Sequence, residues 1–126
     1  MRSAVILVGL VLAACQPAAK PEFDVAGLKP GEDMATLTGW YAFSGRSREF
    51  RLYPTNSDVK AVGKGQCISG VATSLAGVPP ETLEGKKVVI TGNLFPPGSP
   101  DIGATANDCG AGAILVAMDI SYADEK

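Results

Sequence analysis

The sequence contains no histidine, and only 6% of its residues are aromatic and 19% charged. Histidine is the usual general base near neutral pH and the commonest metal ligand, so we expect no metal site and no cofactor. The chain has 11 basic and 13 acidic residues. Because a mildly acidic chain gains nothing from the release of phosphate counterions, we also expect no nucleic-acid partner.

No apolar run is long enough to cross a bilayer as a helix. The run from Ala4 to Ala14 is uncharged and follows a single cation, Arg2. It falls well short of the ~20 residues that a spanning helix needs. A short run of this kind after a basic start is typical of a signal peptide. The remainder, in a chain that is 46% hydrophobic, has the composition of one globular domain.

The end of this run, Leu12-Ala13-Ala14-Cys15, resembles the bacterial lipobox. The resemblance implies that residues 1–14 are a lipoprotein signal peptide, that the chain is cut before Cys15, and that acyl chains on Cys15 anchor it to a membrane. Several acyl chains exceed the two signals that stable anchoring requires. Gln16 replaces the Asp that tends to retain lipoproteins of enteric bacteria on the inner membrane. We therefore expect an envelope location, with the outer membrane facing the periplasm favoured. The alternative is an ordinary secretory peptide with an incidental cysteine.

Residues 15–33 are predicted to be a tether, because three prolines, two glycines and mixed charges leave no helical or alternating period. Docking of Phe23, Val25 and Leu28 on the domain would instead order its second half. The domain itself is assigned to residues 34–126. Alternating or β-rich patterns predict five strands in it, at Thr36–Ser44, Arg48–Pro54, Cys67–Leu75, Lys86–Phe95 and Ala113–Tyr122.

Between the third and fourth predicted strands, Val78–Gly85 has early prolines, an acid and a final glycine, which favours one short helix. This order of elements, and the stretch Leu83–Gly92, resemble the OB-fold. The resemblance implies an all-β domain with one short helix, closed as a small five-stranded Greek-key barrel, and sharp strand bends at Gly39 and Gly92. The glycine-rich 96–112 loop departs from the family pattern, and the basic groove of its nucleic-acid-binding members is missing. The alternative is another small barrel or sandwich.

Cys67 and Cys109 remain once Cys15 is acylated, and an even pair in an oxidising compartment predicts a disulfide. By closing a loop, the disulfide would stabilise the fold by ~4 kcal/mol, because it lowers the chain entropy of the unfolded state. A redox pair is disfavoured because there is no C-x-x-C motif, and two thiols without histidine make half a zinc site at best.

Trp40, Arg51 and Tyr53 are the candidate ligand-binding residues. OB domains bind ligands on the face of their second and third strands, and alternation places Arg51 and Tyr53 together, opposite the core residues Phe50 and Leu52. The alternative is cross-strand pairing on a solvated face.

The expected function is a non-enzymatic binding or structural role in the cell envelope, with a protein or glycan partner. No nucleophile has an evident base, so we predict no catalytic residues. The alternative is an enzyme that acts on the cell wall or a glycan through paired carboxylates. Single-stranded nucleic-acid binding follows from fold analogy alone, and the acidic charge opposes it. The sequence leaves the oligomeric state open.

Overall fold

The computed structural model describes residues 20–31, 33–44, 48–56, 66–73, 83–102 and 105–123. All five predicted strands are present, with ends shifted by a few residues at most. Two 3-10 turns lie wholly within the described residues, and the sequence patterns predicted neither of them. The elements are η1 (Val25–Gly27), β1 (Ala35–Phe43), β2 (Glu49–Tyr53), β3 (Ile68–Ala72), β4 (Lys87–Phe95), η4 (Pro100–Ile102) and β5 (Ile114–Tyr122).

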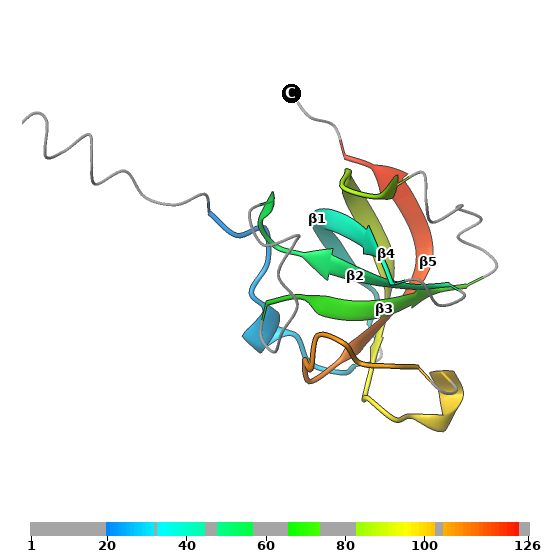
Figure 1. Ribbon diagram of the computed structural model, residues 1–126. Coiled ribbons are helices and arrows are strands. Elements are labelled where there is room, and N and C mark those ends of the chain that lie inside the picture. Colours follow the sequence, from blue (N-terminus) through cyan, green and yellow to red (C-terminus); the bar gives the residue numbers. More distant parts are fainter. Residues whose placement is uncertain are drawn as a thin grey trace, which may run out of the picture.

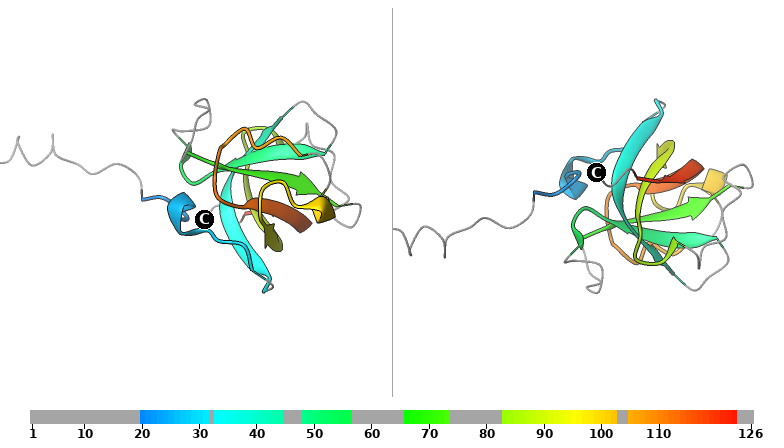
Figure 2. Two further views of the ribbon diagram at one scale, coloured as in Figure 1. Left: turned by 90° about the horizontal axis from the view of Figure 1, so that it is seen from below. Right: turned by 90° about the horizontal axis from the view of Figure 1, so that it is seen from above.

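The strands form a closed barrel in the order β1-β2-β3-β5-β4, with β4 returning to β1 (Figures 1 and 2). All neighbouring pairs are antiparallel except β3 and β5, which are parallel. Closure removes the unpaired sheet edges that promote aggregation. The predicted fold class, a small five-stranded OB-like barrel, is confirmed.

Side-chain alternation explains how the strands enclose a core. Along β4, residues 88, 90, 92 and 94 are buried, and the residues between them are half-buried. The ring of Tyr41 stacks on Phe50 with their centroids 5.2 Å apart, an arrangement that adds to the burial of both rings. The fully buried residues of this cluster include Phe50, Leu52, Ile68, Val88, Ile90, Ala113, Leu115 and Ala117.

Gly92 lies at an irregularity of the barrel, as predicted. The pairing of β4 with β5 shifts register between Thr91 and Gly92, and a Cβ at position 92 would overlap the carbonyl oxygen of Val116. At the other predicted bend, a Cβ on Gly39 would lie 2.6 Å from the carbonyl oxygen of Tyr53. Glycine therefore permits a close approach of two backbones at both positions.

Two expectations fall mainly outside the described residues. The predicted helix Val78–Gly85 is described only from Leu83, which is buried in the core. Gly85 has a φ of 77°, the left-handed conformation typical of a glycine that ends a helix. The predicted signal peptide and Cys15 also lie outside them. In the described part of the chain, no helix has the length and apolar character needed to span a membrane.

Residues 20–31 form a segment that we call the strap, which is the described part of the predicted tether up to Gly31. Val25 is buried, and Phe23 and Leu28 pack against the barrel core. The N–H of Glu22 donates to the carbonyl of Pro54 at 2.9 Å, and the N–H of Gly31 donates to that of Leu94 at 3.2 Å. The strap thus runs from the end of β2 to the end of β4, and is ordered on the barrel as the docking alternative predicts.

Candidate binding pocket and closed sheet face

A disulfide joins Cys67, directly before β3, to Cys109, in the loop before β5, with the two Cα atoms 5.3 Å apart. Both cysteines are fully buried in a second apolar cluster with Ala42 and Tyr53, against which Trp40 packs. This cluster lies apart from the barrel interior. The predicted disulfide is confirmed, and it pins a distant loop onto the outer face of the strands.

Residues 105–113, which we call the cap loop, are also hydrogen-bonded to that face. The N–H of Ala106 donates to Glu49 Oε1 at 3.3 Å, and the N–H of Cys109 donates to the buried hydroxyl of Ser69 at 3.0 Å. An Asp108 carboxylate oxygen lies 3.9 Å from an Arg51 guanidinium nitrogen. The cap loop therefore covers the outward face of β2 and β3, where OB domains commonly bind ligands.

The structure corrects the prediction that Tyr53 lies with Arg51 on an exposed ligand-binding face. The two residues share the outer face of β2 as predicted, and Arg51 Nε donates to the Tyr53 hydroxyl at 3.1 Å. Tyr53, however, is 0% exposed, so its ring offers no surface on which a ligand could stack. Alternation assigned the face correctly, but it carries no information about a loop that returns from fifty residues away to cover that face.

Trp40 is half-buried and lies in a different environment from Arg51. The Lys87 ammonium is 5.1 Å from the centre of the Trp40 ring and 3.1 Å from a carboxylate oxygen of Glu22. The indole ring therefore joins the disulfide cluster, β4 and the strap. The three predicted ligand residues do not form one open site.

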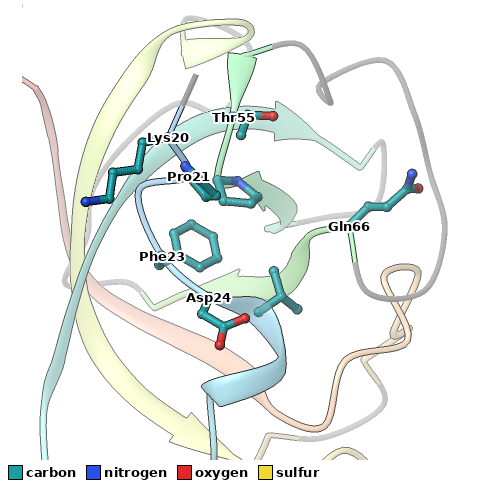
Figure 3. A pocket seen from close by; sticks show the side chains of 8 residues that line it. Lys20, Pro21, Phe23, Asp24, Thr55 and Gln66 are labelled. Atoms are coloured by element: carbon teal, nitrogen blue, oxygen red, sulfur yellow. The ribbon is translucent and has the colours of Figure 1, made fainter. Parts of the chain in front are cut away.

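A pocket of about 500 Å³ opens instead between the strap, the end of β2 and the start of β3. Its apolar lining comes from Pro21, Phe23, Val25 and Pro54. Figure 3 shows the Phe23 and Pro21 rings at its centre, and the side chains of Lys20 and Gln66 at opposite edges, directed outward. Its size is within the range of small-ligand sites.

The polar lining of the pocket is sparse and already partly engaged. It consists of Lys20, Asp24, Thr55 and Gln66. Asp24 is the one carboxylate among the described lining residues, and its Oδ1 accepts the N–H of Ala26 at 3.2 Å, which caps η1. In the described parts of the chain, no three His, Cys, Asp or Glu residues lie together as a metal-binding group. The geometry suits an apolar group that makes a few polar contacts at its edge.

Sequence reasoning missed this pocket because residues 15–33 were interpreted as a tether. The apolar series Phe23, Val25 and Leu28, on which the docking alternative was based, was the signal that could have indicated it. A second hollow, of about 560 Å³, lies at the other end of the strap, between Pro30–Gly31 and 93–96 at the end of β4. Both hollows therefore exist because the strap packs on the barrel.

No family model, no curated protein and no solved structure matches the chain. The functional argument consequently depends on the residues and their geometry.

Proposed function

We propose that this protein is an envelope lipoprotein, anchored through acyl chains on Cys15, whose barrel has a non-enzymatic binding or accessory role. Its expected location is the periplasmic face of the outer membrane. The pocket beside the strap is the proposed contact site for an envelope protein or glycan.

The disulfide between Cys67 and Cys109 is the observation that carries the location. Disulfides persist in oxidising compartments such as the periplasm, and are rare where thiol reductants are maintained. Two buried cysteines, paired across the fold, support export of the chain. Export in turn fits the apolar run that ends at Leu12-Ala13-Ala14-Cys15.

The binding role rests on the pocket and on the closed face of β2 and β3. With that face covered by the cap loop, the apolar surface of Pro21, Phe23 and Pro54 is a concave site that the described residues offer to a partner. A wall-acting enzyme would need two carboxylates across one cleft. Asp24 is one carboxylate, and its side chain caps η1, so the binding role has the better support.

The anchor is tested by expressing the full chain with its own leader in a Gram-negative host that is fed an alkyne-tagged fatty acid. The expected result is label on the wild type and none on Cys15→Ser, with the wild-type protein in the outer-membrane fraction. Mass spectrometry of the N-terminal peptide should show acylated Cys15 as the first residue. An intact leader, or an unmodified Cys15 in soluble material, would contradict the proposal.

The binding role is tested by affinity capture from envelope extract, with two variants that each add positive charge. Gln66→Arg adds a cation at the pocket edge, whereas Asp101→Arg changes the exposed η4 turn. We expect one defined partner or glycan to be enriched by the wild type and by Asp101→Arg, and to be lost with Gln66→Arg. Equal recovery with both variants would place binding elsewhere.

A further inference from the structure

Lys20, the first described residue, lines the pocket only five positions after Cys15. Five residue steps span at most about 18 Å when fully extended. A domain of about 100 residues has a radius of gyration of about 13 Å, so it measures roughly 30 Å across. If Cys15 is acylated, as proposed above, the link between lipid and barrel is shorter than the barrel itself.

The two 3-10 turns mark opposite sides of the molecule. In both figures of the whole molecule, η1 lies where the strap leaves towards the N-terminus, and η4 lies across the barrel from it (Figures 1 and 2). The pocket adjoins η1, since Asp24 and Val25 line it. If η4 faced the lipid and η1 pointed away from it, Lys20 would lie roughly a domain diameter, about 30 Å, from the membrane surface. The short link does not permit this orientation.

The charges around the pocket are nearly balanced. Lys20 and Asp24 contribute one charge of each sign, and Glu22 is paired with Lys87 at 3.1 Å. The described residues of this surface therefore contribute no excess of cations to attract anionic lipids. The apolar residues Pro21 and Phe23, by contrast, gain from leaving water at the boundary between headgroups and acyl chains.

From this geometry we propose that the link to Cys15 holds the pocket side of the barrel against the phospholipid headgroup layer of the anchoring membrane. The headgroup region is about 5–7 Å thick on each side of the bilayer. Because the link from Cys15 to Lys20 reaches at most about 18 Å, the pocket lies at or close to this region. The envelope partner proposed above would then meet this pocket at the membrane surface. The proposal rests on the proposed anchor, and deepens it by assigning the face that meets the lipid.

The test attaches the lipid chemically, so that it does not depend on cellular acylation. In a chain that begins at Cys15, oxidation pairs Cys67 with Cys109 and leaves Cys15 as the free thiol, which takes a maleimide phospholipid. A single tryptophan is then placed at Ala26→Trp on η1 or at Asp101→Trp on η4, both exposed, in a Trp40→Phe background. Thermal melts confirm that each variant folds.

On neutral phosphatidylcholine vesicles that contain a headgroup nitroxide, we expect the tryptophan at 26 to be quenched at least threefold more than the tryptophan at 101. The difference should not change between low and high salt, because the charges of the described residues beside the pocket balance. A 20-residue Gly-Ser spacer after Gln16, with a mean span of about 25 Å, should reduce it. Equal or reversed quenching with the short link, or a difference that the spacer leaves unchanged, would overturn the proposal.

Hydrogen exchange on the same vesicles provides a second readout without a tryptophan variant. The amides of residues 20, 22–26 and 55 should gain protection relative to the unlipidated chain, whereas those of residues 48–50, 99, 101 and 102 should not. Protection confined to the second group would contradict the proposal. Failure of the fatty-acid labelling in cells, with the orientation retained on vesicles, would refute the anchor and leave the surface assignment intact.

Discussion

Ser69 and Cys109 are joined by a buried hydrogen bond, in which the backbone N–H of Cys109 donates to the Ser69 hydroxyl at 3.0 Å. Ser69 is only 2% exposed, and it lies two residues after Cys67, the disulfide partner of Cys109. Cys67, directly before β3, and Ser69, within β3, therefore hold the same point of the cap loop, one covalently and one by a hydrogen bond. This double attachment converts an outer sheet face into a second small core.

The Ser69→Ala substitution should lower the free energy of unfolding by about 1–3 kcal/mol, because it leaves a buried N–H without its acceptor. Urea unfolding at neutral pH measures the loss. Ser121→Ala, at an exposed position of β5, is the matched control and should stay within about 0.5 kcal/mol of wild type. Equal effects of the two substitutions would show that the hydrogen bond does not hold the cap loop.

The Cys67→Ala/Cys109→Ala double variant should lose up to ~4 kcal/mol of unfolding free energy, because the disulfide closes a loop of about 43 residues in the unfolded chain. A reductant should lower the melting temperature of the wild type and leave that of the double variant unchanged. Because both cysteines are fully buried, reduction should accelerate when urea opens the cap loop. Two titratable thiols at Cys67 and Cys109 in native, unreduced protein would show that the disulfide does not form.

Replacing Gly92 by alanine should destabilise the barrel severely, by about 3 kcal/mol or more, because the new Cβ meets the backbone carbonyl of Val116 on β5. Backbone of a closed barrel has little freedom to retreat. Gly112→Ala is the control, since a Cβ there meets nothing within 4 Å, and it should be neutral or slightly stabilising. Chemical denaturation measures the stability of both variants. Comparable unfolding midpoints would contradict the predicted destabilisation by Gly92→Ala.

Val25→Ala should loosen the strap while leaving most of the barrel intact. The substitution removes two methyl groups from a buried position, which costs about 1–2 kcal/mol. Hydrogen exchange should accelerate at the N–H groups of Glu22 and Gly31, which bond to the barrel, but not at those in the centre of β4. Ala26→Ser, at the exposed neighbouring position, should alter neither set. Uniform acceleration in Val25→Ala would mean that strap and barrel unfold as one unit.

Most of the barrel could be predicted because a strand with one buried face shows an alternation of apolar residues within a short stretch of sequence. The alternation of Val88, Ile90 and Leu94 reflects a period of two that is visible over a few residues, and all three line the core. On β5 the alternation located the strand but not its core face, because Leu115 and Ala117 line the core whereas Val116 and Met118 are half-buried. Gly92 was placed correctly because the OB-like stretch 83–92 contains it. The pairing of Cys67 with Cys109 followed from a count, since two cysteines remain once Cys15 is set apart.

The pocket and the closed face could not be predicted in this way. The burial of Tyr53 depends on a loop that is about fifty residues distant in the sequence, and the pocket depends on a strap that has neither helical nor strand periodicity. Such contacts are set by the three-dimensional paths of segments whose local sequence favours no regular structure, so no local pattern reports them.

By itself, the sequence determined the leader pattern that ends at Cys15, the five strands, the core faces of β1, β2 and β4, and the cysteine pair, because each depends on neighbouring residues or on a simple count. Only the tertiary structure decided which surfaces remain open. Packing of the cap loop removes Tyr53 from solvent, and packing of Phe23 and Val25 on the barrel creates the pocket. Which residues stay exposed to solvent depends on how segments distant in the sequence pack together, so the exposed surface is a property of the whole fold.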